Sequence, residues 1–429
     1  MSEWTTIAEL ADTNPESLPA NTDRDFRFRY IDLGSVDDGA IDWQSVQSIS
    51  FKNAPSRARR VCTAGDALFG TVRPNLQSHG YIPEGNKDDV VASTGFTIIR
   101  AHEHVADGRY IFFSLLSDNI LRQSINAAVG SNYPAVTDRD VRHFRVFAPP
   151  VEQQSKIADV LTSLDTQIQK TEALIAKLEK VKEGLLHDLL TRGIDANGQL
   201  RPSPEQAPEL YKESPLGLIP REWQFATADQ FCAAVADGTH DSPKPAAEGY
   251  PLATSKNLKQ YGLDLTDSYL ISKADYEQVI KRSWVEEGDI LFGMIGTIGN
   301  PTALTHEQTL IAPKNVGIFR LGGDLIKSSF LLNHLGSRHL TNQIDKILLG
   351  STQKFVGLGA LKSLIIPTPS RAEMGRISSA INSINQKISL EKATLNKRKT
   401  QKTGLMDDLL TGRVRVTPLL DQAQATTPA

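Results

Sequence analysis

Residues 149–193 read PPVEQQSKIADVLTSLDTQIQKTEALIAKLEKVKEGLLHDLLTRG. Apolar side chains recur in this stretch at alternating spacings of four and three residues, which places one narrow stripe of a helix against a partner helix. Only Thr171 and Lys182 interrupt the stripe. The stretch therefore predicts a coiled-coil helix that runs about 48 Å between its first and last apolar positions. Those positions are Ile157, Leu161, Leu164, Ile168, Ile175, Leu178, Leu185 and Leu189.

The same pattern returns 220 positions later without a gap. Glu391 stands where the first copy has Thr171, and Lys402 matches Lys182. This repeat predicts an internally duplicated chain in which each half ends in a long helix. The apolar positions of the second copy are Ile377, Ile381, Ile384, Ile388, Leu395, Leu405 and Leu409.

The two predicted helices differ in charge. Residues 151–193 contain six Lys/Arg and seven Asp/Glu, a balance of −1, whereas residues 371–413 contain nine and four, a balance of +5. Opposite charge favours pairing of the two helices with each other over self-pairing. Two solvated faces that merely diverged in composition are the alternative interpretation.

The polar seam positions predict a register for an antiparallel pair. Lys182 should face Glu391, and by pseudo-two-fold symmetry Thr171 should face Lys402. Gly184 and its repeat partner Gly404 each destabilise a helix by about 1 kcal/mol relative to alanine. They are either relics of the duplication or places where another helix or a partner subunit comes close.

Short strand-like runs precede each helix, and the repeat extends into them. GDALFG at 65–70 matches GDILFG at 288–293 at an offset of 223, whereas the helices match at 220, which predicts one three-residue loop insertion. A single helix is expected around 110–126. Ser370 and Glu373 fit a capping box at the start of the second long helix.

The predicted fold class is α+β, with two mixed α/β domains, each followed by a long helix, and the two helices paired as a coiled coil. The expected parts are a first domain at 1–148, a first helix at 149–193, a linker at 194–219, a second domain at 220–368, a second helix at 369–413 and a flexible tail at 414–429.

Composition narrows the class of protein. A chain of 429 residues suggests two or three domains. No apolar run has the length of a membrane span and the start does not resemble a signal peptide, so a cytoplasmic location is expected. Cys62 and Cys232 are too few for a disulfide framework or a cysteine zinc site.

No catalytic motif is visible. The chain lacks the Asn/Asp-Pro-Pro-aromatic motif of amino-methyltransferases and a phosphate-binding Gly-x-x-x-x-Gly-Lys-Ser/Thr loop. Gly293, Gly296 and Gly299 have the wrong spacing for a dinucleotide fingerprint and indicate a turn between two strands. The histidines show no metal-ligand spacing. We therefore expect no catalysis, metal or cofactor in this chain.

Several polar positions are candidates for contact with nucleic acid, because Lys and Arg bind phosphates while Asn, Gln and Arg pair with base edges. Each is also compatible with a solvated loop. Their recurrence in both halves favours the DNA-binding interpretation. The candidates are Arg57, Arg59, Arg60, Arg73, Asn75, Ser131, Asn132 and Tyr133 in the first half, and Lys256, Asn257, Lys314, Asn315, Ser351, Thr352, Gln353 and Lys354 in the second.

The order of domains and helices resembles the specificity subunit of type I restriction–modification systems, which act in phage defence. PPVEQQSKIADVL, GLLHDLLTRGI and GLMDDLLTGRV are similar to the two conserved regions of that family. ESPLGLIPREW resembles the entry to its second target-recognition domain, and GDALFG, GDILFG and GSTQKFVGLGAL resemble the framework of its recognition domains. One departure is SRAEMGRI at 370–377, which replaces the opening seen at 150–157.

The resemblance implies that the two helices form an antiparallel coiled coil, which holds the two recognition domains apart. It further implies that each domain recognises one half of a split site in double-stranded DNA, while the helices set an unspecific spacer. It also implies two methylation subunits that hold S-adenosylmethionine, and two restriction subunits that use ATP and Mg²⁺, as partners. A coiled-coil scaffold without sequence recognition is the alternative, but it would not need duplicated domains with divergent loops. A fused nuclease or methyltransferase would need motifs that the chain lacks.

Overall fold

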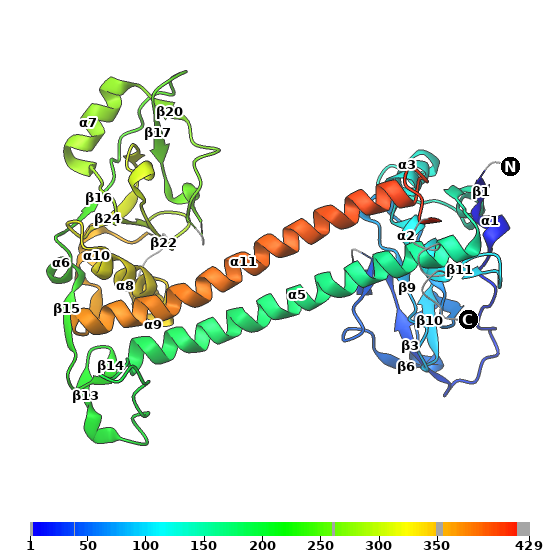
Figure 1. Ribbon diagram of the computed structural model, residues 1–429, viewed down its shortest axis with the longest axis horizontal. Helices are drawn as coiled ribbons and strands as arrows, with labels where there is room; N and C mark the ends of the chain where they lie inside the picture. The colour runs from blue at the N-terminus through cyan, green and yellow to red at the C-terminus, as the bar shows by residue number, and fades with distance from the viewer. Residues whose placement is uncertain (1–2, 38, 260–261, 349–354, 418–429) are drawn as a thin grey trace. The chain divides into compact units, whose positions relative to one another are not determined.

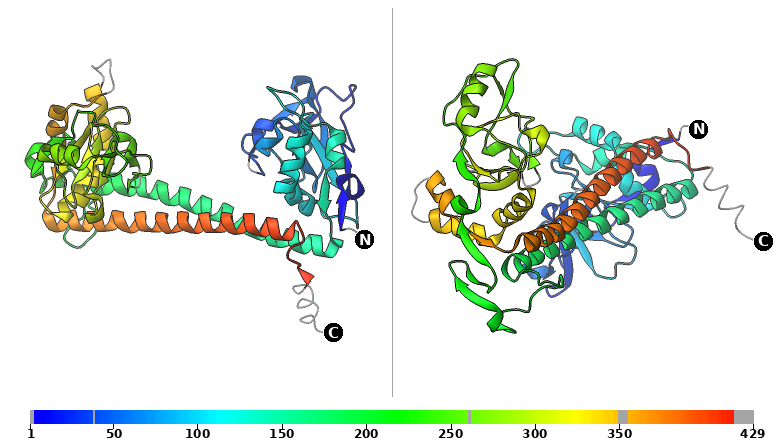
Figure 2. Two further views of the ribbon diagram at one scale, coloured as in Figure 1. Left: turned by 90° about the horizontal axis from the view of Figure 1, so that it is seen from above. Right: turned by 60° about the vertical axis from the view of Figure 1, so that its left-hand side comes forward.

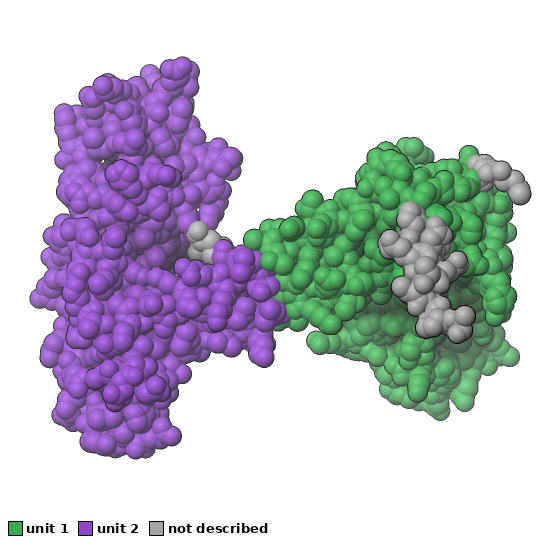
Figure 3. All heavy atoms as spheres, viewed as in Figure 1, with its two compact units in different colours: residues 1–173, 393–429 green, residues 174–392 purple. Residues whose placement is uncertain are grey.

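The computed structural model describes residues 3–37, 39–259, 262–348 and 355–417, and the chain divides into two compact units (Figure 3). Unit 1 comprises residues 1–173 and 393–429, and unit 2 comprises residues 174–392. Each unit contains one set of strands and short helices together with part of both long helices, α5 (Val151–Thr191) and α11 (Arg371–Leu409) (Figure 1).

Unit 1 is built on two four-stranded sheets with the strand orders β2-β11-β8-β9 and β6-β3-β10-β7. Strands β3 and β10 pair in parallel, and the other neighbours in both sheets are antiparallel. A further short pair joins β1 to β12. The elements are β1 (Trp4–Thr6), α1 (Ile7–Leu10), β2 (Ala11–Thr13), β3 (Arg27–Ile31), β4 (Val36–Asp37), β5 (Ala40–Ile41), β6 (Ser48–Ser50), β7 (Ala58–Cys62), β8 (Ala67–Gly70), β9 (Gly80–Tyr81), β10 (Val90–Ser93), β11 (Phe96–Ala101), α2 (Gly108–Leu115), α3 (Asp118–Ala127), α4 (Asp138–His143) and β12 (Arg145–Phe147).

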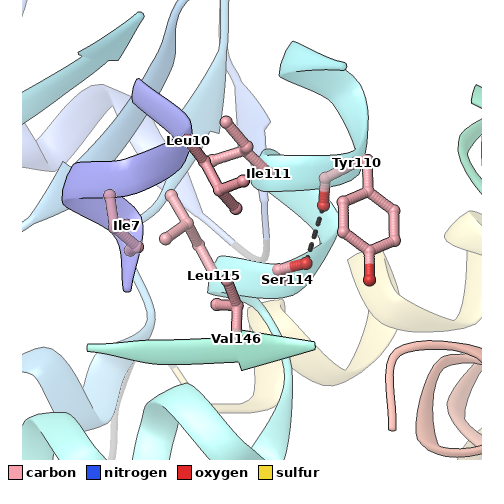
Figure 4. A pocket seen from close by; sticks show the side chains of 7 residues that line it. All are labelled: Ile7, Leu10, Tyr110, Ile111, Ser114, Leu115 and Val146. Atoms are coloured by element: carbon pink, nitrogen blue, oxygen red, sulfur yellow. Dashed lines mark hydrogen bonds between the residues drawn. The ribbon is translucent and has the colours of Figure 1, made fainter. Parts of the chain in front are cut away.

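Side chains of β8 point alternately to its two faces and so enter two different hydrophobic cores. Ala67 and Phe69 face the core that is shared with the helices, while Leu68 faces the core between the two sheets. The helical core is closely packed around α1, α2 and β12 (Figure 4). Inside it the Ser114 hydroxyl donates to the Tyr110 carbonyl at 2.9 Å, and the Tyr110 hydroxyl donates to the Phe147 carbonyl at 2.6 Å. Its buried polar groups are thus paired.

Unit 2 repeats this arrangement. Its four-stranded sheet has the order β16-β24-β21-β22, the counterpart of β2-β11-β8-β9, and β17 pairs in parallel with β23 as β3 does with β10. The elements are β13 (Tyr211–Ser214), β14 (Gly217–Pro220), β15 (Gln224–Thr227), α6 (Ala228–Phe231), β16 (Ala234–Asp237), β17 (Tyr250–Ala253), β18 (Leu258–Lys259), β19 (Gly262–Leu263), β20 (Leu270–Ile271), α7 (Lys273–Ser283), β21 (Ile290–Gly293), β22 (Gly299–Ala303), β23 (Ala312–Pro313), β24 (Val316–Arg320), α8 (Leu325–Leu335), α9 (Arg338–Leu348), α10 (Leu358–Ser363) and β25 (Ile365–Thr368).

Two local predictions need correction. The single helix expected at 110–126 is two helices, α2 and α3, because the Ser117 hydroxyl accepts from the Ile120 amide and starts α3 afresh. The halves also differ by more than a three-residue loop. Unit 2 has the eleven-residue helix α7 before its GDILFG motif, where unit 1 has strand β7 before GDALFG.

The long helices begin and end at recognisable signals. The Gln153 and Gln154 amides in the first turn of α5 donate to the Pro150 carbonyl, and α5 ends at Thr191 just before Gly193, whose φ is +67°. Only half of the predicted capping box forms on α11: the Ser370 hydroxyl accepts from the Glu373 amide at 3.3 Å. The Glu373 carboxylate instead accepts from Arg201 and from the Ile194 amide.

Ion pairs between α5 and α11 follow the predicted charge difference. In unit 1, Asp165 pairs with Lys402 at 2.6 Å and Glu172 with Lys399 at 2.8 Å; in unit 2, Glu179 pairs with Lys392 at 2.7 Å. Partner numbers rise on one helix as they fall on the other, so the helices are antiparallel. Figure 2 shows both helices from two further sides. The carboxylates come from α5 and the ammonium groups from α11.

The predicted register is wrong. Thr171 accepts from Arg398 and not from Lys402, which pairs with Asp165. Among the described residues, Lys182 forms no ion pair with Glu391. The reason is that the Arg398 side chain reaches the Thr171 hydroxyl, while Lys402 pairs with Asp165, six residues before Thr171 on α5, and lies 5.8 Å from the Phe113 ring.

Reversing the charge of Lys402 to glutamate is expected to destabilise unit 1 by about 1 kcal/mol, because it replaces a half-buried ion pair with two like charges. Adding Asp165→Lys should restore most of the loss, as measured by hydrogen exchange of peptides from α5. The more exposed pair Glu172–Lys399 is the control and should respond less. If the double variant is no more stable than Lys402→Glu alone, this register is incorrect.

The stretch 194–219, predicted as a linker, is folded. Strands β13 and β14 form an antiparallel hairpin, and Ile194 and Arg201 are buried in unit 2. A side-chain carbon added at Gly184 or Gly404 would meet no described atom within 4 Å, so close packing of another described segment does not explain either glycine. No helix among the described residues is both long and apolar enough to cross a membrane.

Candidate nucleic-acid interface

Two loops of unit 1 lie side by side and bring together most of the candidate residues of the first half. The loop after β8 contains Arg73 and Asn75, and the loop before α4 contains residues 131–133. A bridge between Val72 and Ala135 joins them, and the Arg73 amide donates to the Pro134 carbonyl at 2.7 Å. We call residues 71–77 and 129–135 the paired loops.

Cationic, aromatic and apolar side chains are exposed together on the paired loops. The Arg73 guanidinium lies 4.6 Å from the centre of the Tyr133 ring, a cation–π contact. Tyr133 is 70% exposed and Val129 is 80% exposed, which is unusual for such large side chains. Asn75, Ser131 and Asn132 are exposed beside them. This surface combines hydrogen-bond donors with flat and apolar groups that can contact bases.

The predicted basic cluster of Arg57, Arg59 and Arg60 does not act as one group. Arg60 forms an ion pair at 2.9 Å with Asp138, which also accepts from the Thr97 hydroxyl, so Arg60 links β7, β11 and α4. The Arg59 guanidinium lies over the Phe51 ring at 4.9 Å. Of the three, Arg57 alone is exposed.

Parallel pairing of β17 with β23 brings the two Lys-Asn pairs of unit 2 to the same edge, because both pairs follow the ends of these strands. The Ser255 hydroxyl donates to the Asn315 carbonyl at 3.4 Å across that edge. Lys256 is exposed, whereas Lys314 bonds to the Ser242 hydroxyl. Asn257 is buried and holds the turn between Thr254 and Asp264, so it cannot reach a base.

The sequence did not single out His240, which lies at this edge. Its two ring nitrogens contact the Asn315 side-chain oxygen at 2.8 Å and Asp237 at 3.1 Å. Asp237 also pairs with Arg282 at 2.9 Å. The proline-containing loop that follows Gly238 was a usable signal, because loops at strand ends commonly carry function. The candidates Ser351, Thr352, Gln353 and Lys354 lie outside the described residues.

The glycine series of unit 2 lies in the turn between β21 and β22, as predicted, with positive φ at Gly296 and Gly299. Ile295 and Phe355 form the counterpart of the Val72–Ala135 bridge, and both are 42% exposed. A groove of about 1820 Å³ within unit 2 runs past this turn and along α8, α9 and the neighbouring parts of α5 and α11.

Two buried thiols and two buried imidazoles are held in uncharged forms. Burial raises the pKa of the Cys62 thiol far above its ordinary value and that of the Cys232 thiol to about 12. Burial likewise lowers the pKa of His79 to about 3 and that of His334 to about 4. Both thiols and both imidazoles are therefore neutral at pH 7. Across the described part of the chain, no three His, Cys, Asp or Glu side chains gather as a metal site.

Comparison with known proteins follows the same division of the chain. The family model for the type I restriction modification DNA specificity domain matches residues 63–180 and 220–398. The MjaVIII type I restriction enzyme specificity subunit of Methanocaldococcus jannaschii is 22% identical over 336 residues, which cover 77% of this chain and 75% of that protein. Each match to the family model contains one GD-x-LFG motif and part of one long helix.

Two solved structures share the fold. The S subunit of a type I restriction–modification system from M. genitalium matches with a TM-score of 0.58 and 14% identity, covering 95% of this chain and 96% of that one. A chain from a structure of complex assembly in the type I R-M system matches with a TM-score of 0.57 and 22% identity, covering 95% and 97%. With more than half of its length matched by the family model, this chain belongs to the type I restriction–modification DNA specificity family.

Proposed function

We propose that this protein is the DNA-recognition subunit of a type I restriction–modification complex and that each unit recognises one half of a split site. The observation that carries this proposal is the repeated sheet order of the two units combined with different side chains at matching loops. At matching positions, unit 1 has Val72, Arg73 and Ala135, whereas unit 2 has Ile295, Gly296 and Phe355. Two copies of one scaffold with different contact surfaces are suited to two different half-sites.

In this proposal the chain recognises DNA and its partners perform the chemistry. Methylation subunits would hold S-adenosylmethionine, and restriction subunits would use ATP and Mg²⁺. The neutral buried thiols and imidazoles of this chain agree with a recognition role, since none is activated as a nucleophile. The net charge of −3 fits a complex in which partner subunits share the phosphate contacts.

Co-expression with the cognate methylation subunit is expected to produce N6-methyladenine in a split motif: two short defined halves around a fixed undefined gap. Replacing residues 1–148 by the matching domain of a family member with a different motif should change one half only, because unit 1 would recognise it alone. Replacing residues 220–368 should change the other half. Mapping of N6-methyladenine across the host genome measures both outcomes.

A catalytically inactive methylation subunit is the control and should leave the genome unmodified. If the subunits co-purify but the wild-type complex methylates no motif, the alternative of a scaffold without sequence recognition gains support. If either exchange alters both halves at once, the assignment of one unit to each half is incorrect.

A further inference from the structure

Arg73 has a backbone conformation that arginine seldom adopts. Its φ is +50°, in the left-handed region, where a side chain is disfavoured and glycine is not. Gln77 at the other end of the same turn has a φ of +47°. Strained residues of this kind persist where the surrounding structure holds them, and they concentrate at functional sites.

The matching turn of unit 2 shows what the backbone itself requires. Counting from the last residue of each GD-x-LFG motif, Arg73 corresponds to Gly296, and the bridges Val72–Ala135 and Ile295–Phe355 fix the same alignment. Gly296 has a φ of +73°, so both turns use the left-handed region at this position. Unit 2 has glycine at this position, the residue that adopts a positive φ without steric cost. The arginine of unit 1 is therefore not required by the turn, and its side chain needs another explanation.

The Arg73 side chain is held in one orientation, but no carboxylate among the described residues pairs with its charge. Six other arginines of unit 1 each pair with a carboxylate, whereas within the described residues Arg73 forms no ion pair. Its guanidinium stacks on Tyr133, and one of its nitrogens donates to the Asn132 carbonyl at 3.5 Å. Stacking fixes the plane of the guanidinium while other donors remain free for a ligand. The six paired arginines are Arg29, Arg60, Arg100, Arg109, Arg413 and Arg415.

We propose that Arg73, oriented by Tyr133, specifies a guanine in the half-site recognised by unit 1. The planar fork of an arginine matches the O6 and N7 acceptors that guanine presents in the major groove. A pre-oriented side chain loses less conformational freedom on binding, which favours this contact over a mobile phosphate contact. This inference rests on the proposed function and adds to it one base and the residue that recognises it.

The test uses the complex of this chain with its methylation subunit and DNA duplexes that carry the mapped motif. In each duplex one guanine is replaced by 7-deazaguanine, which lacks the N7 acceptor. The wild-type complex is expected to bind one such duplex roughly 5- to 150-fold more weakly. Arg73→Gly should bind the unmodified duplex as weakly and show no further loss with the modified one. The Arg73→Gly variant should fold normally, since glycine occupies the matching position, Gly296, in unit 2.

Three further variants test the shape of the guanidinium group and its orientation by Tyr133. Arg73→Lys keeps the charge but removes the fork, and it should lose the same 7-deazaguanine sensitivity. Tyr133→Phe should retain that sensitivity and Tyr133→Ala should weaken it, because only the ring is needed to orient Arg73. Arg24→Lys is the matched control: this arginine is exposed on another loop of unit 1 and should behave as wild type.

The outcomes distinguish this inference from the proposed function. If no split motif is methylated by the wild-type complex, the proposed function fails. If the motif exists but the half assigned to unit 1 contains no guanine, the role of Arg73 is refuted and the proposed function stands. The role is also refuted if wild type and Arg73→Gly respond equally to 7-deazaguanine, or if Arg73→Gly weakens binding to every duplex alike, as loss of a phosphate contact would.

Discussion

Replacing Glu373 by alanine is expected to destabilise unit 2 by about 3–5 kcal/mol. The Glu373 and Arg201 side chains are 5% and 9% exposed, and the carboxylate accepts from the Arg201 guanidinium at 2.5 Å and from the Ile194 amide at 2.9 Å. Its removal leaves a buried guanidinium and a buried backbone donor without this partner. The pair joins the end of α5, the segment after it and the start of α11, so the loss should affect all three.

Hydrogen exchange of peptides from residues 188–201 and 371–381 measures this effect within unit 2, where a single unfolding midpoint of the two-unit chain would not be well defined. Glu222→Ala is the matched control. Glu222 also contacts Arg201, at 3.1 Å, but its side chain is 80% exposed, so its loss should change stability by less than about 1 kcal/mol. Equal effects of the two variants would show that burial of Glu373 does not matter.

Arg100→Met is expected to destabilise unit 1 by about 3–5 kcal/mol, because it leaves the buried Asp66 carboxylate without an ion partner and with only the Thr63 amide and hydroxyl as donors. Two Arg100 nitrogens donate to Asp66 at 2.9 and 2.8 Å, and the Asp66 side chain is 1% exposed. These hydrogen bonds raise the pKa of Arg100. The measurement is hydrogen exchange of peptides from β8 and β11.

Replacing both partners, as Arg100→Met with Asp66→Leu, should recover much of that stability, because the buried charge is then absent. If the double variant is as unstable as Arg100→Met alone, the effect does not arise from an unpaired charge. The matching site of unit 2 differs: Arg320 donates to the Trp284 and Arg282 carbonyls, and burial raises the pKa of Asp289. Asp289→Asn should therefore cost less than the loss of Arg100.

The repeated motif GD-x-LFG illustrates what can be predicted from sequence. Its recurrence identified equivalent strands, and both copies form the buried strand of a sheet with the same neighbours. The reason for its last glycine became visible only in space. A side-chain carbon at Gly70 would lie 2.4 Å from the Ser78 carbonyl oxygen, and one at Gly293 would lie 2.2 Å from that of Thr297.

The candidate contact residues fall into two groups: those that remain available to a ligand and those that are already bound by neighbouring side chains or backbone. Arg73 and Tyr133 remain exposed and stacked, whereas Arg60 is used by Asp138 and Asn257 by its own turn. All four are polar loop or strand-end residues in the sequence. Sequence pattern predicts the chemistry that a side chain can perform, but whether a neighbour already uses that chemistry depends on contacts between distant segments. His240 was missed for the same reason.

The sequence alone determined the duplication, the two long helices and the sign of the charge on each, because apolar periodicity and net charge are local properties of a chain. Only the tertiary structure decided the register of the helix pair, in which Lys402 faces Asp165 and Arg398 reaches Thr171. It likewise decided the folded state of residues 194–219 and the partner of Glu373. Each of these depends on which side chains meet in the folded chain. Several charged side chains lie at similar distances from one possible partner, and their order along the sequence does not show which of them will pair with it.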